Sequence, residues 1–177
     1  MTAGDWKEKN LLTFKGPGGS QPYSGLAFDK AGNLYGTTQA GGKYNKGVVF
    51  KLAREAGGKW KETILHSFRG GSDGDAPSST PIFDKAGNLY GMTGEGGDPA
   101  CTGNGYGCGT VFKLTPGKDG RWKETVLHRF TAGSDGSLPV GGLAIDAAGR
   151  LYGTTAGGGN AGCYDNGGCG VVFEITP

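Results

Sequence analysis

The chain has 177 residues, of which 39 are glycine and 8 are proline, and its 18 basic and 16 acidic residues give a formal net charge of +2. This composition excludes long helices and with them an α/β nucleotide-binding fold, and the interspersed charges exclude the basic surface of a nucleic-acid-binding protein. No apolar run approaches the roughly 20 residues that a membrane helix needs, and the first residues contain no signal-peptide core. Short clusters of Val, Thr, Tyr, Phe and Trp between glycine-rich stretches predict an all-β protein.

The first predicted element is residues 6–14, which begin with Trp-Lys-Glu and end in Phe. Four short strands are predicted after it, at residues 26–29, 34–38, 48–52 and 60–68. The link from Asp29 to Asn33 combines an Asp that can bond to the following backbone with a Gly that can take a positive φ, so it predicts a tight turn. The last of the four strands repeats the Trp-Lys-Glu start and the Phe end of residues 6–14.

This set of strands is repeated along the chain. Residues 26–38 return as residues 81–93 and 143–155, and residues 47–52 return as residues 109–114 and 170–175. We interpret residues 1–177 as one repeat domain whose units cover approximately residues 22–68, 77–130 and 139–177.

Nearly all the length difference between the units lies in the loop between their second and third strands. In an antiparallel meander this loop and the loop that leads to the next unit emerge at the same edge of the sheet. One rim is therefore expected to be long and variable, and variable loops on a rigid scaffold are where binding usually occurs.

Four-stranded antiparallel meanders in tandem are typical of β-propeller blades. The chain starts with a fourth strand and ends with a third, so residues 6–14 are expected to complete a last blade. Three blades are too few for a ring, which typically has about 4 to 8. We therefore expect a homodimer whose six-bladed ring is closed by exchange of residues 6–14. A nine-bladed homotrimer is the first alternative, and a monomeric three-sheet prism is the second.

The motif Leu-Tyr-Gly-Thr-Thr at residues 34–38 and 151–155, together with Gly-Thr-Val-Phe-Lys-Leu at residues 109–114, resembles the GloVer tandem repeat. That family comprises exported bacterial proteins with many such repeats, often ahead of one of several interchangeable surface anchors. The resemblance covers nearly the whole chain and implies an exported, propeller-like module, extracellular or at the cell surface. It implies no general activity for individual residues.

The four cysteines form two local pairs inside the longer loops. We predict disulfides between Cys101 and Cys108 and between Cys163 and Cys169, which favour an oxidising compartment. The alternative is a zinc site, but the spacing of each pair differs from the close spacing of zinc knuckles.

No catalytic constellation, metal site or cofactor site is predicted. Residues 70–74 match the Gly-x-Ser-x-Gly pattern, but no helix follows, as a nucleophile elbow requires. His66 and His128 occupy equivalent places and are expected to pack or to make a satisfied hydrogen bond. The equivalent glutamates Glu8, Glu62 and Glu124 are expected to be solvated. The Trp residues two positions before them could stack on sugar rings, but packing between blades is the favoured interpretation.

Ligand contacts are expected on the long rim. The candidates are the loop tyrosines and the nearby aspartates, namely Tyr44, Tyr106, Tyr164, Asp73, Asp75 and Asp135. The aspartates could bind calcium or sugar hydroxyls, although turn formation is the favoured interpretation of their Asp-Gly steps. Polar loops that contain Tyr, Asp, Asn and Gly suit a hydroxyl-rich partner.

The sequence thus predicts a non-catalytic extracellular binding or scaffold module, with a carbohydrate as the expected ligand class and a second copy of the chain as the expected partner. One alternative is a metal-dependent hydrolase or lyase that acts at the central channel of the ring. Another is a purely structural repeat spacer, which would bind no ligand.

Overall fold

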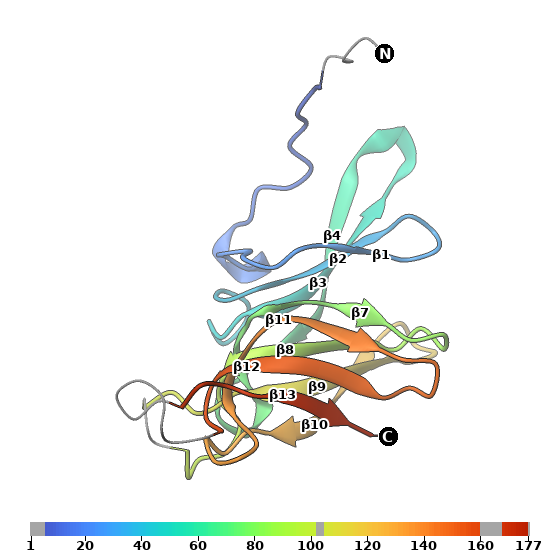
Figure 1. The fold of residues 1–177 in the computed structure, drawn as a ribbon. Coiled ribbons are helices and arrows are strands. Elements are labelled where there is room, and N and C mark those ends of the chain that lie inside the picture. The colour runs from blue at the N-terminus through green and yellow to red at the C-terminus, as the bar shows by residue number, and fades with distance from the viewer. Residues whose placement is uncertain (1–5, 102–104, 160–167, 177) are drawn as a thin grey trace.

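The computed structural model describes residues 6–101, 105–159 and 168–176. This part of the protein consists of three β-sheets, which confirms the predicted all-β fold (Figure 1). Its helices are three short 3₁₀ turns, Gly16–Gly18, Ala56–Gly58 and Gly71–Asp73. No helix in the described ranges is long and apolar enough to cross a membrane.

The first sheet contains four antiparallel strands in sequence order. They are β1 (Ala27–Phe28), β2 (Leu34–Thr38), β3 (Val48–Arg54) and β4 (Trp60–Ser67), close to the predicted ranges. The pairing of β3 with β4 places Val49 opposite His66 and Phe50 opposite Ile64, so Leu65 is a bulge residue. β2 is buried along its whole length, because apolar side chains pack on both faces of this sheet.

The second sheet has a first strand that is broken in two. β5 (Asp75–Pro77) and β7 (Ile82–Phe83) both pair with β8 (Leu89–Glu95), and β9 (Thr110–Pro116) and β10 (Trp122–Arg129) follow. Between the two pieces, β6 (Ser79–Thr80) leaves the sheet and pairs with the next one. The β9–β10 pairing has its bulge at Leu127, which is equivalent to Leu65.

The third sheet contains β11 (Ser137–Ile145), β12 (Leu151–Gly157) and β13 (Val172–Ile175), in the order β13-β12-β11-β6. These three strands are antiparallel, but β6 pairs with β11 in parallel. Within one chain this unit therefore contains the three antiparallel strands that the sequence predicts, and the additional strand β6 comes from the preceding unit. In the described part of the chain no strand pairs with the outer edge of β13.

Residues 6–14 were expected to form a strand, but they form none. A strand needs the backbone groups of a neighbouring edge to pair with. The edge without a fourth strand belongs to β13, and residues 6–14 lie at the opposite end of the molecule from β13 (Figure 1). None of the three sheets closes on itself within one chain.

Adjacent sheets are joined by the same aromatic contact. Phe68 packs edge-on against Phe112 and Phe130 against Phe173, with 5.1 Å between ring centroids in each pair. Phe68, Phe112 and Phe130 are fully buried. Because the first residue of each pair follows a fourth strand and the second lies in the next sheet, these pairs form the centre of each sheet-to-sheet contact.

The turn after the first strand of each unit is built as predicted. Asp29 accepts hydrogen bonds from the backbone N–H groups of Ala31 and Asn33, and Gly32 has a φ of 79°. The hydroxyl of Tyr35 donates to the same carboxylate at 3.0 Å. The pairs Asp84 with Tyr90 and Asp146 with Tyr152 repeat this bond. The short rim is therefore uniform.

The long loops meet at the opposite rim, also as predicted. The backbone N–H of Gly42 donates to the carbonyl of Gly16 at 2.9 Å, which joins the two kinds of loop in the first unit. The equivalent bonds, at 2.8 Å, run from Gly97 to Gly71 and from Gly159 to Gly133. These bonds give the long rim the same framework in each unit.

Candidate functional site

A polar groove lies on the long rim where the first and second sheets meet. Its volume is about 330 Å³. Its polar side chains are those of Lys46, Arg69, Asp75, Asp98 and Tyr106. Pro99, Cys101 and the backbone of several glycines complete the lining. We call it the rim groove.

The charged centre of the rim groove is the pair of Lys46 and Asp75. Asp75 is only 8% exposed and its carboxylate lies 2.5 Å from Lys46 Nζ. The bond to Asp75 raises the pKa of Lys46, and burial together with the Asp75 charge raises the pKa of Glu95. Because Glu95 pairs with Asp75 across β5 and β8, Lys46 is the cation that balances two neighbouring carboxylates.

Two exposed tyrosines lie at this rim. Tyr106 lines the groove and is 66% exposed, and Tyr44 is 40% exposed. The guanidinium of Arg69, another lining residue, lies 5.8 Å from the centre of the Tyr44 ring, and Lys43 Nζ lies 5.2 Å from it. The structure therefore brings together three of the predicted ligand residues, Tyr44, Tyr106 and Asp75. Tyr164 lies outside the described residues.

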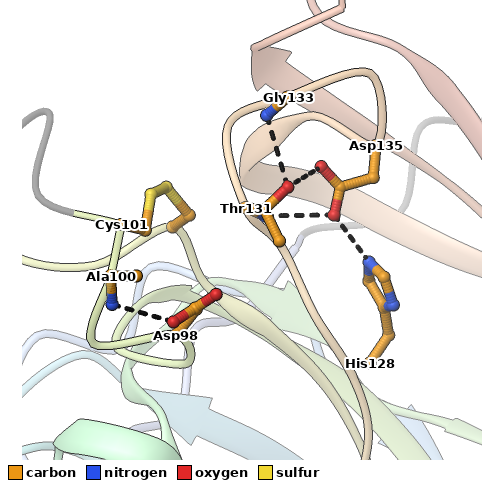
Figure 2. Close-up of a disulfide and its surroundings, with 8 residues drawn as sticks. Asp98, Ala100, Cys101, His128, Thr131, Gly133 and Asp135 are labelled. Atoms are coloured by element: carbon orange, nitrogen blue, oxygen red, sulfur yellow. Dashed lines mark hydrogen bonds and ion pairs between the residues drawn. A yellow bond between two sulfur atoms is a disulfide. The ribbon is translucent and has the colours of Figure 1, made fainter.

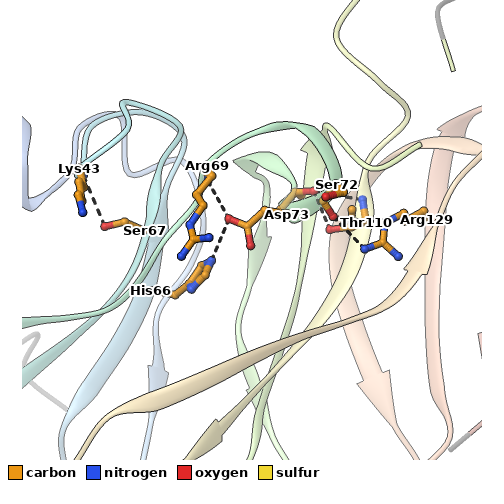
Figure 3. A network of polar contacts seen from close by, with 9 residues as sticks. Lys43, His66, Ser67, Arg69, Ser72, Asp73, Thr110 and Arg129 are labelled. Atoms are coloured by element: carbon orange, nitrogen blue, oxygen red, sulfur yellow. Dashed lines mark hydrogen bonds and ion pairs between the residues drawn. The ribbon is translucent and has the colours of Figure 1, made fainter. Parts of the chain in front are cut away.

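Asp73 and Asp135 hold their own loops together. Asp73 accepts a hydrogen bond from the Arg69 backbone N–H at 2.7 Å and lies 3.2 Å from His66 Nε2 (Figure 3). Burial raises the pKa of Asp73, but the hydrogen bonds from His66 and Arg69 outweigh it and leave the pKa below its usual value. This carboxylate acts in the loop and does not line the rim groove.

The second of these loops has the same design. Asp135 accepts hydrogen bonds from the N–H of Thr131 at 3.0 Å and from its hydroxyl at 2.6 Å, and it lies 3.1 Å from His128 Nε2 (Figure 2). The hydrogen-bonded role expected for both histidines is confirmed. What the sequence analysis missed is the partner, although a His seven residues before an Asp recurs in both units.

A disulfide closes the loop beside the rim groove. Cys101 and Cys108 form it, and Cys101 lines the groove (Figure 2). Cys169 is also disulfide-bonded, but its predicted partner, Cys163, lies outside the described residues.

The prediction that the glutamates are solvated is wrong for Glu62 and Glu124. In each, Oε1 is buried and makes no hydrogen bond, and burial raises the pKa of both side chains. Glu62 lies against Gly18 of the 3₁₀ turn Gly16–Gly18, and the charge of Asp73 further raises the pKa of Glu124. The sequence does contain an indication of this burial, because the period-2 alternation of a strand puts Glu62 on the same face as Ile64.

A larger groove of about 680 Å³ lies on the short rim between the first two sheets. It is lined by aromatic side chains, among them Phe28, Phe83 and Trp122, and Phe28 is 67% exposed. We call it the aromatic groove. Its carboxylates, Asp29 and Asp84, are already engaged in the turns. This groove therefore has apolar area but few polar groups free to orient a ligand.

The fold and the rim together define an all-β tandem-repeat protein whose long loops form a polar groove between neighbouring sheets. The family model of the Gloeobacter/Verrucomicrobia repeat matches residues 1–177, and the chain belongs to this repeat family. No curated protein matches the chain.

Proposed function

We propose that the protein is a non-catalytic, exported binding module of the β-propeller type that takes a carbohydrate in the rim groove. Each sheet acts as one blade, and a second copy completes a ring of six, with a ring of nine from three copies as the alternative. The recurrent Phe–Phe contact supports equivalent packing of the blades, and the disulfides fit an oxidising, extracellular setting.

The observation that carries this proposal is the composition of the rim groove. A sugar ring offers apolar C–H faces that stack on exposed aromatic rings, and hydroxyl groups that need charged or amide partners. Tyr106 provides the exposed ring, and Lys46, Asp75 and Arg69 provide donors and acceptors. Bare glycine backbone along the groove lets a ligand approach main-chain groups closely.

Glycan-array binding followed by titration calorimetry tests the proposal. Wild-type protein is compared with Tyr106→Ala and with Phe28→Ala, a matched loss of an exposed ring in the aromatic groove. We expect the first variant to bind about five- to 150-fold more weakly, taking for a sugar ring the roughly 1 to 3 kcal/mol that a nucleic-acid base contributes when it stacks on an aromatic side chain. The second variant should bind as the wild type does.

Other outcomes correspond to the other functions. Absence of binding to every glycan tested would contradict the proposal and support a structural spacer. Release of cleaved sugar in the presence of added divalent metal would support the hydrolase or lyase. Loss of binding in Phe28→Ala alone would move the site to the short rim.

A further inference from the structure

A third groove follows the outer edge of β13, where the other two sheets have their fourth strands. Its volume is about 300 Å³. We call it the edge groove, and its lining includes His128, Phe130, Asp135, Phe173 and Glu174. In the first and second sheets the equivalent edges are covered by β4 and β10. An open strand edge of this kind is a template for another strand.

The chain contains a matching segment at its other end. Residues 6–14 repeat the Trp-Lys-Glu start and Phe end of β4 and β10, yet Trp6 is fully exposed. Phe14 packs edge-on against Phe50 with 5.1 Å between ring centroids, as Phe68 does on Phe112. The end of the segment therefore already has the position that a fourth strand takes toward the sheet that follows it.

We propose that the edge groove binds residues 6–14 of a second copy of this chain as an antiparallel fourth strand. The inference rests on the ring assembly in the proposed function and assigns its contacts. In this arrangement Phe14 keeps its contact with Phe50 of its own chain. The third sheet of one copy then packs beside the first sheet of the other through the same Phe–Phe contact that joins adjacent sheets within the chain. Two such junctions, related by a two-fold axis, give every sheet of the assembly a fourth strand.

The register of the junction follows from the two complete units. Phe50 lies opposite Ile64 and Lys51 opposite Thr63, and the second sheet repeats this with Phe112 opposite Val126 and Lys113 opposite Thr125. The same register at the junction places Phe173 opposite Asn10 of the second copy, Glu174 opposite Lys9, and Ile175 opposite Glu8.

This register brings opposite charges together only at the junction. Inside the chain the cross-strand pair is a lysine opposite a threonine, as in Lys51 with Thr63. At the junction it becomes Glu174 opposite Lys9 of the second copy, so both positions change to a complementary pair. Opposite charges on directly facing strand residues stabilise a pair and like charges destabilise it. The change favours a copy of this chain as the occupant.

A glycine provides an independent sign of the same junction. A Cβ on Gly47 would lie 2.5 Å from the ring of Pro77 in the next unit, and one on Gly109 would lie 2.4 Å from Pro139. The third unit keeps the glycine as Gly170, and Pro22 follows residues 6–14 at the position of Pro77. In the proposed junction Pro22 of the second copy packs on Gly170.

Charge reversal across the junction tests the proposal. Lys9→Glu and Glu174→Lys are made singly and together, and sedimentation equilibrium measures self-association, with circular dichroism to verify folding. Lys7→Glu is the matched control, because it makes the same charge change on the same segment without facing Glu174. Glu174 also lies 3.9 Å from Arg150 in its own chain, so Lys9→Glu is the cleaner single variant.

We expect each single reversal to weaken association about tenfold and the double variant to recover most of it, because two junctions change together. An equimolar mixture of the two single variants should also associate, since a two-membered ring then has both junctions matched. A three-membered ring would always keep one like-charged junction. Equal self-association of wild type, Lys9→Glu and the double variant would overturn the assignment.

Amide hydrogen exchange on the wild type gives a second, variant-free measurement. Residues 8–14 and 172–175 should gain protection together as protein concentration rises. Protection of both segments that is independent of concentration would mean that the chain folds back on itself, and no protection at any concentration would also contradict the proposal. A monomeric Lys9→Glu variant should still bind sugar in the rim groove, so failure of one proposal leaves the other testable.

Discussion

The ring of Phe14 packs edge-on against that of Phe50 at an interplanar angle of 70°, although Phe14 belongs to a segment that forms no strand. The fully formed pair of Phe68 and Phe112 has the same centroid distance and an angle of 64°. Phe14 therefore makes the contact that Phe68 makes at the end of β4, although residues 6–14 are not paired as a strand. The N-terminal segment is held by Leu11, Leu12 and Phe14, which pack against the first sheet, and is exposed over residues 6–10.

Phe68→Ala should destabilise the protein by about 3 to 5 kcal/mol, because it empties a fully buried site between two sheets. Phe14→Ala should have a smaller effect in dilute solution, where Phe14 is only partly buried, and an effect closer to that of Phe68→Ala at high protein concentration. Urea unfolding at several protein concentrations measures both. Equal effects at all concentrations would contradict a role for Phe14 between copies.

Glu124→Gln should stabilise the protein at neutral pH. Burial and the charge of Asp73 raise the pKa of Glu124 in the folded protein, so folding favours the protonated carboxyl. The stability associated with this group is therefore complete below the unfolded value of about 4.5 and is lost as the pH rises through the folded value. Thermal unfolding between pH 4 and pH 8 should show a gain that shrinks toward acid pH.

Asp84→Ala should cost about 1 kcal/mol, since it removes the acceptor of partly buried hydrogen bonds from Asn88 and Tyr90. Burial raises the pKa of Asp84, but hydrogen bonds from Asn88 and Tyr90 outweigh it and lower the pKa below 3.8. The stabilisation is thus present above pH 3.8 and is lost as the pH falls through the folded value. The same pairing, together with burial, raises the pKa of Tyr90 to about 12. An acid-unfolding midpoint unchanged by the substitution would refute this account.

Replacing Cys101 and Cys108 by Ser should destabilise the protein by about 2 to 3 kcal/mol through the lost loop closure. The sheets should remain, because the disulfide lies in the loop at the rim and the repeated strands do not depend on it. Far-ultraviolet circular dichroism is expected to stay constant while proteolysis near residues 98–108 becomes faster. Loss of the β-sheet signal would show that the disulfide supports the core.

Most of the fold could be predicted from local patterns. The tight turn at Asp29 and the strands around it follow from residue type and period-2 alternation, and the repeats multiply that information. The parallel step of β6 across to β11 was not predictable, because it depends on how neighbouring sheets approach and only two residues take part. The open edge of β13 was implied by the order of strands. That residues 6–14 form no strand within one chain follows from the position of this segment far from β13, which only the three-dimensional structure shows.

The candidate site was predictable only in outline. Sequence placed Tyr44, Tyr106 and Asp75 on one rim, but the charge balance between Lys46, Asp75 and Glu95 depends on pairing across β5 and β8. Asp73 and Asp135 looked equally available, and their use inside the loops follows from histidines seven residues earlier in the chain. Glu62 and Glu124 are buried by residues outside their own strands. The alternation within a strand predicts only which residues share a face.

The central claim is that chains of three blades complete one another, and the molar mass of the wild-type protein in solution tests it most directly. Light scattering after size exclusion should give about twice the chain mass of 18.1 kDa, and deletion of residues 1–14 should return the protein to a single chain. Three times the chain mass would support nine blades. A stable monomer at high concentration, or an assembly that survives the deletion, would contradict closure by the N-terminal strand.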